Sequence, residues 1–164
     1  LPFPRAEGRL NLQMSMARSL FYVGRAEEAL EWLDKAEETV REFPQLAQYE
    51  LLLLDRRGLY AKEADRWEDS VASYQKVHGA VSASKNNLVS SPLNRLKAKL
   101  GEASAHIGGG NFEQALACLD KVARRYLSRT RRLWFYKKYA GIRRLSAPDK
   151  KRIGRILRFF EGRE

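Results

Sequence analysis

The sequence predicts an all-α fold built from three helical hairpins. The first observation behind this prediction is an internal repeat, because the segments 24–36, 65–77 and 110–122 superpose without a gap. The second is a set of small residues that recurs with spacings of 12 and 7 in every repeat. The third is that 44% of the 164 residues are hydrophobic, which is enough to bury a core and argues against disorder.

The small residues mark the places where the two helices of each hairpin are expected to cross. They are Ala17, Ala29 and Ala36 in the first repeat, Gly58, Ser70 and Val77 in the second, and Ala103, Ala115 and Val122 in the third. A large residue, Leu33, Tyr74 or Leu119, follows each middle position by four and so shares its helix face. Small side chains let two antiparallel helices approach closely, and the large side chain fills the groove beside the crossing.

These units resemble the tetratricopeptide repeat family, whose unit is a helix-turn-helix of about 34 residues with small residues at such positions. The resemblance covers roughly residues 10–126, with longer periods of 41 from Ala29 to Ser70 and 45 from Ser70 to Ala115. The proline that often ends a unit has one counterpart, Pro44. The resemblance implies a right-handed α-solenoid over residues 1–127, with repeats at about 10–44, 45–84 and 92–127.

The helices expected within these repeats follow one another in pairs. Their expected bounds are Arg9–Val23, Glu27–Glu42, Gln45–Glu63, Trp67–Ala83, Leu93–Ile107 and Phe112–Tyr126. Within each pair the turn falls at Gly24-Arg25, at Asp65-Arg66 or at 108–111, where glycine and aspartate favour turn conformations. The polar, proline-ended stretch 82–92 is expected to be a mobile loop between the second and third hairpins.

The C-terminal quarter differs from the rest of the chain in charge. Residues 1–122 hold 16 Lys+Arg and 17 Asp+Glu, whereas residues 123–164 hold 15 and 3, a net of +12 in a chain of net +11. Two helices are expected there, one with an aromatic stripe at 131–140 and one amphipathic and basic at 150–160, after a capping signal at Ser146. The segment 128–164 is expected to cap the solenoid, to bind nucleic acid, anionic lipid or an acidic protein, or to do both with different faces.

Binding of a polyanion by this segment would depend on its basic side chains. The candidates are Arg131, Arg132, Lys137, Lys138, Arg143, Arg144, Lys151, Arg152 and Arg155. Three neighbouring aromatic residues, Trp134, Phe135 and Tyr136, could stack on exposed bases.

The family resemblance also implies a concave groove that holds an extended peptide or a partner helix. It would be lined by Asn11, Met14, Arg18, Phe21 and Tyr22 from the first hairpin, Leu52, Asp55, Leu59 and Lys62 from the second, and Lys97, Leu100, Ser104 and Ile107 from the third. For Phe21 and Tyr22, packing between repeats is an equal alternative to ligand contact.

Spacing in the sequence gives no catalytic or metal-binding constellation, so neither an enzyme activity, a metal nor a cofactor is expected. His78 and His106 are 28 residues apart, with no Cys or carboxylate expected at metal-ligand spacing, and each is interpreted as an ordinary helix residue. Cys118 is the one cysteine and is expected to serve packing. A lone thiol favours a reducing compartment, here the cytoplasm, or carries no signal about compartment.

Two functions follow from these patterns. The leading one is a scaffold or adaptor that holds a partner protein in the groove, and the alternative is binding of nucleic acid or an anionic surface by the basic segment. A third reading is that the chain, which begins with Leu1, is a fragment that serves regulation or assembly in a larger protein. No apolar stretch approaches the ~18 residues of a membrane span.

Overall fold

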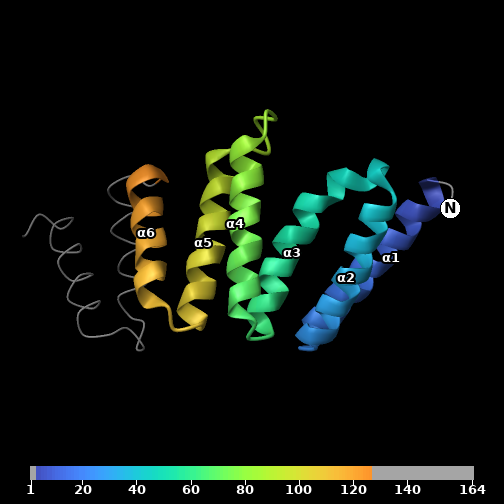
Figure 1. The fold of residues 1–164 in the computed structure, drawn as a ribbon, viewed down its shortest axis with the longest axis horizontal. Helices are drawn as coiled ribbons and strands as arrows, with labels where there is room; N and C mark the ends of the chain where they lie inside the picture. The colour runs from blue at the N-terminus through green and yellow to red at the C-terminus, as the bar shows by residue number, and fades with distance from the viewer. Residues whose placement is uncertain (1–2, 127–164) are drawn as a thin grey trace, which may run out of the picture.

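The computed structural model describes residues 3–126, which form six α-helices and one 3-10 helix. The elements are α1 (Phe3–Tyr22), α2 (Ala26–Glu42), η1 (Pro44–Tyr49), α3 (Glu50–Glu63), α4 (Trp67–Ala83), α5 (Pro92–Gly108) and α6 (Phe112–Tyr126). Within residues 3–126 the helices lie side by side in chain order, from α1 at one end of this part to α6 at the other (Figure 1). The predicted all-α class is therefore confirmed over this range, within which no strand occurs.

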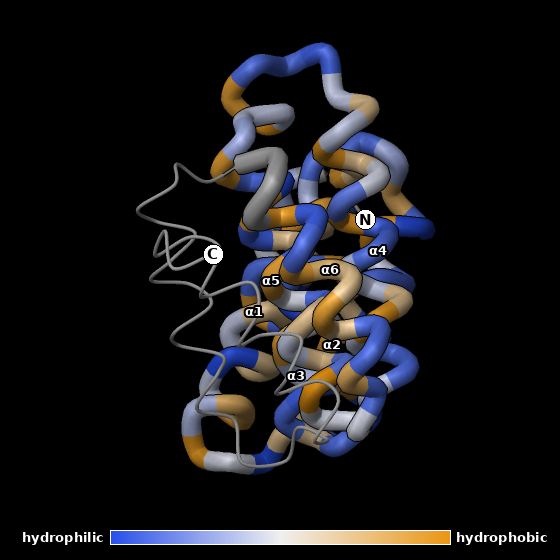
Figure 2. Tube along the Cα trace, turned by 90° about the vertical axis from the view of Figure 1, so that its left-hand side faces the viewer, coloured by the Kyte–Doolittle hydropathy of each residue, from blue (hydrophilic) through white to orange (hydrophobic). Residues whose placement is uncertain are grey.

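Each expected pair of helices packs together, and each pair also contacts the next through α2 and α3 or through α4 and α5. All nine small residues that were expected at the crossings are buried. At the crossing of α3 and α4 the hydroxyl of Ser70 donates a hydrogen bond of 2.6 Å to the carbonyl oxygen of Gly58. Hydrophobic and hydrophilic residues alternate along the helices, as expected where one face of each helix is buried (Figure 2).

The turns of the three hairpins share one backbone conformation. Gly24, Asp65 and Gly110, which are equivalent in the repeat, have φ values of 80°, 58° and 78°. In the second hairpin the N–H of Arg66 donates to the carbonyl of Ala61 at 2.8 Å, and the same bond recurs in the other two turns. This left-handed residue with its backward hydrogen bond ends a helix and satisfies its last carbonyls.

The first two hairpins depart from the expected helix bounds. Helix α1 starts at Phe3 rather than Arg9, because its additional turn buries Ala6 in the core of the first hairpin. The expected helix over 45–63 is wrong at its start, where Pro44 begins the separate 3-10 helix η1 and α3 follows from Glu50. Proline is well suited to the first position of a helix, and the buried Leu46 anchors this 3-10 turn.

Aromatic side chains join the second hairpin to the third. The ring of Tyr74 lies between two glycines, since an added Cβ would lie 2.9 Å from the ring at Gly58 and 2.4 Å from it at Gly101. Trp67 packs in the same way on the end of α5, where a Cβ on Gly108 would lie 2.1 Å from its ring. The glycines of α5 therefore allow the close contact between α4 and α5.

The connector between α4 and α5 is held by side-chain hydrogen bonds to its backbone. The amide of Asn94 donates to the carbonyls of Leu88 and Val89 at 3.0 and 3.1 Å, and Arg95 donates to the carbonyl of Ser90. Ser91 caps α5 by accepting from the N–H of Asn94. Between residues 3 and 126, none of the helices combines the length and the apolar character needed to cross a membrane.

Candidate partner-binding groove

A pocket of about 330 Å³ lies between α1 and α3. Its lining residues are Asn11, Met14, Ser15 and Arg18 of α1, Leu33 of α2, and Leu52, Arg56 and Tyr60 of α3. Leu33 and Tyr60 are buried and form its apolar base, whereas Arg18 is exposed. The pocket therefore combines an apolar base with a cationic rim. We call it the first pocket.

A second pocket, of about 390 Å³, lies among α3, α4 and α5. Its lining residues are Gln48, Leu51, Leu52 and Asp55 from η1 and α3, Val77 and Val81 from α4, and Asn94, Lys97 and Ala98 from α5. Leu52 lines both pockets and is 37% exposed, which is high for a large apolar side chain. The two pockets therefore share Leu52 as a lining residue, and we refer to the pair, which is bordered by α1, α3 and α5, as the groove.

The cations of this groove are available to a ligand. Arg18 and Arg56 in the first pocket and Lys97 in the second have no carboxylate within ion-pair distance among residues 3–126. The neighbouring Arg57 differs, because it is ion-paired with Asp34 and with Glu37 of α2. Three cations and one acid, Asp55, therefore give the groove a net positive charge.

The structure brings some of the residues expected in the groove to these pockets. Asn11, Met14 and Arg18 line the first, Leu52 lines both, and Asp55 and Lys97 line the second. Phe21 instead stacks on Tyr60 with ring centroids 4.4 Å apart, so it packs between α1 and α3. Tyr22 contacts Phe21 edge to face and is 76% exposed.

The remaining groove candidates line neither pocket. Leu59 packs, partly buried, against the core of the first hairpin, and Lys62 lies 3.6 Å from the carboxylate of Glu63. Leu100, Ser104 and Ile107 are half-buried on α5. The cations from Arg131 to Arg155 that were proposed to bind a polyanion lie outside the described residues, as does the expected pair of C-terminal helices.

Sequence reasoning missed Arg56 and Tyr60 in the first pocket. Leu52, Arg56 and Tyr60 are spaced by four residues, which places them on one face of a helix, so this spacing was an available signal. The face predicted for α3 was instead centred on Asp55, Leu59 and Lys62.

A second group of side chains meets between α5 and α6, where no site was expected. Glu102, His106 and Cys118 each place one potential ligand atom within 4.8 Å of the others. The expectation that His106 has no carboxylate at ligand spacing is wrong, because Glu102 precedes it by four residues on α5. That spacing was visible in the sequence, whereas the approach of Cys118 depends on how α6 packs.

The electrostatics of this group follow from its burial. Burial of the Cys118 thiol, with the negative charge of Glu102 beside it, raises the pKa of the thiol to about 11. Burial also opposes ionisation of Glu102, but hydrogen bonds from Lys99 at 2.6 Å and Gln75 at 3.0 Å outweigh it and lower the pKa of Glu102.

Comparisons with protein-family models, with curated proteins and with solved structures find no match for this chain.

Proposed function

We propose that this chain is a non-enzymatic interaction module that binds a partner peptide or helix in the groove across α1, α3 and α5. The observation that carries the proposal is the pair of pockets that share the half-exposed Leu52 as a lining residue. Two such pockets with apolar walls suit consecutive anchor side chains of one ligand, and a groove of this kind is a common mode of peptide recognition.

The charges of the groove indicate the chemistry of the partner. Arg18, Arg56 and Lys97 border the two pockets without carboxylate partners in the described range, so acidic side chains of a ligand would form charge-assisted hydrogen bonds there. Apolar side chains of the same ligand would contact Met14 and Leu52. We therefore expect a partner segment that alternates apolar anchors with Asp or Glu.

We also propose that the fold is a right-handed α-solenoid of three elongated hairpins of the tetratricopeptide repeat type. Its support is the equivalent left-handed residue in each turn, the burial of all nine small residues and the arrangement of the helices in chain order. Such stacks present a continuous surface from the first helices of successive units.

A second candidate function is binding of nucleic acid or another anionic surface by residues 123–164. It is favoured by the net charge of +12 on that segment. Affinity of this kind falls steeply with salt, with a log–log slope of about −0.9 per neutralised phosphate on duplex DNA. A salt titration on labelled duplex therefore distinguishes it from groove binding.

The experiment that tests the groove is a selection of displayed random peptides on the full chain. The peptides retained are then measured against the charge-reversed variant Arg18→Glu with Lys97→Glu. The matched control is Arg5→Glu with Lys76→Glu, which reverses two exposed cations outside both pockets. We expect acidic, apolar peptides whose binding is lost in the first variant and kept in the second. Equal binding to both variants, or no enrichment of peptides, would overturn the proposal.

A further inference from the structure

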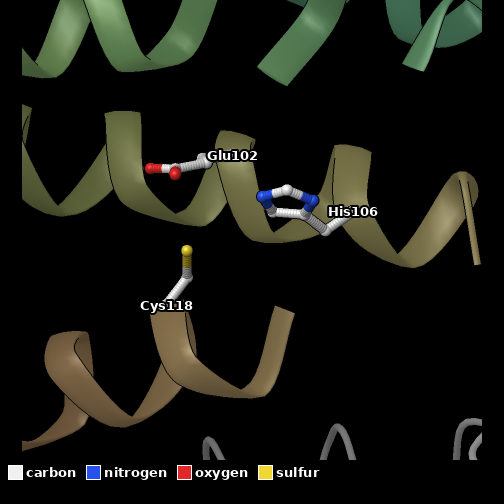
Figure 3. Close-up of side chains that lie close together, drawn as sticks. All are labelled: Glu102, His106 and Cys118. Carbon is white, nitrogen blue, oxygen red and sulfur yellow. The ribbon is translucent and has the colours of Figure 1, made fainter. Parts of the chain in front are cut away.

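The interface of α5 and α6 contains a group of side chains that the groove does not use. Glu102 and His106 project from α5 toward Cys118 of α6, and one ring nitrogen of His106 is turned toward the other two side chains (Figure 3). One donor atom from each residue lies within 4.8 Å of the others. Glu102 and Cys118 are buried, so the group is shielded from bulk water.

Thiolate, imidazole and carboxylate are the ligands that Zn²⁺ takes from proteins. Zinc bonds of about 2.0–2.3 Å in a tetrahedron place the donor atoms roughly 3.3–3.8 Å apart. Donors within 4.8 Å of one another therefore need only small side-chain rotations to close on an ion. The donor set is too soft for Mg²⁺ or Ca²⁺, which prefer oxygen alone.

One further observation points to a ligand. It does not come from the buried Nδ1 atom of His106, which has no hydrogen-bond partner within the described part of the chain, because the ring nitrogen turned toward Glu102 and Cys118 is Nε2 (Figure 3). The carboxylate of Glu102 is oriented by Lys99 and Gln75, which donate to its two oxygens. Donors of this kind fix the direction of a carboxylate ligand from outside the metal site.

We propose that Glu102, His106 and Cys118 bind a Zn²⁺ ion that ties α5 to α6. On binding, the Cys118 thiol loses its proton to solvent and the thiolate becomes a ligand, while the fourth coordination position is left to water. The ion would hold α5, which supplies Lys97 to the second pocket, so the site would also stabilise one wall of the groove. The inference does not depend on the groove binding a partner.

The test is a titration of the reduced, metal-free full chain with Co²⁺, followed by displacement with Zn²⁺. Since Cys118 is the one cysteine of the sequence, a thiolate-to-cobalt absorption band reports on this residue alone. We expect the band to saturate at one equivalent and to disappear when Zn²⁺ is added. In His106→Gln and in Glu102→Gln the affinity should fall more than tenfold, whereas the control His78→Gln, which changes the other histidine, should leave it unchanged.

Absence of the band in a chain whose circular dichroism is helical would overturn the proposal. So would an unchanged affinity in both His106→Gln and Glu102→Gln, because the thiol would then bind metal without the other two residues. X-ray absorption of the zinc-loaded, unmodified chain decides the matter if the variants fail to fold. One sulfur at about 2.3 Å with nitrogen or oxygen at about 2.0–2.2 Å is expected, and a first shell without sulfur would contradict the site.

Discussion

Helix α5 approaches the ring of Tyr74 as closely as glycine permits, because a Cβ on Gly101 would lie 2.4 Å from the Cε1 atom of that ring. The ring is buried and meets Gly58 of its own hairpin on the other side. Tyr74 therefore joins the second and third hairpins, whose helices α3 and α5 border the second pocket.

Substitution of Gly101 by alanine should destabilise the protein by about 1–3 kcal/mol, because the buried Tyr74 ring cannot move away from the new methyl group without strain. The matched control is Gly79→Ala in α4, where a Cβ meets nothing within 4 Å. That change should stabilise by roughly 0.5–1 kcal/mol, since alanine is the better helix former. Denaturant unfolding of both variants measures the difference, and midpoints that shift in the same direction would contradict the packing.

Alkaline pH should lower the stability of the folded chain through ionisation of Tyr74. Burial of Tyr74, with the charge of Asp55 nearby, raises the pKa of Tyr74 to about 12. Between about pH 10, where an unfolded tyrosine ionises, and pH 12, the unfolded chain binds fewer protons than the folded one, so stability falls as pH rises. The contribution of Tyr74 is at most about 1.4 kcal/mol per pH unit. Across this range the unfolding free energy of the native chain should therefore fall more steeply with pH than that of Tyr74→Phe. A constant difference would show that the hydroxyl is not buried.

A substitution at the left-handed residue of the second turn should have the opposite effect on stability to one at the equivalent glycines of the other turns. Asp65 has a φ of 58° where Gly24 and Gly110 stand in the equivalent turns. Non-glycine residues are strained in this region, so Asp65→Gly should stabilise by up to about 1 kcal/mol, whereas Gly24→Ala should destabilise by about 1–2 kcal/mol. Thermal unfolding tests both changes, and a loss of stability in Asp65→Gly would argue against the shared turn.

The helix crossing of the first hairpin should tolerate no larger side chain. Ala29 is fully buried between α1 and α2, so Ala29→Leu should cost about 1–3 kcal/mol through overpacking. Ala72 is an exposed alanine of α4, and Ala72→Leu serves as the control for the change in side chain alone. If both variants unfold at the midpoint of the native chain, the crossing does not lie at Ala29.

The hairpins were predictable because the signals that form them are local and repeated. The spacings of 12 and 7 fixed which helices pair, and all nine small residues are buried where that pairing requires. The break at Glu50 was not predictable from helix periodicity, because it depends on Leu46 burying itself in a core built by other helices. The same holds for the additional turn of α1, which Ala6 anchors in that core.

The candidate site was predictable only in part, for a related reason. The periodicity of a helix shows which of its residues share a face. It does not show how the helix is rotated about its axis relative to the neighbouring helices. Arg18 and Lys97 were therefore expected in the groove, while Arg56 was missed, although it lies one residue beyond the expected Asp55. Glu102 and His106 share a face by their spacing, but the approach of Cys118 is fixed only when α6 packs on α5.

Photo-crosslinking at Leu52 shows whether a ligand occupies the groove across α1, α3 and α5. A benzophenone amino acid at this position replaces a residue that lines both pockets, and the same group at Leu88, which is 84% exposed and lines neither pocket, is the control. After irradiation with the peptides selected on the full chain, we expect a covalent peptide adduct at position 52 and none at position 88. Adducts at position 88 alone, or equal yields at both positions, would show that the peptide does not bind in the groove.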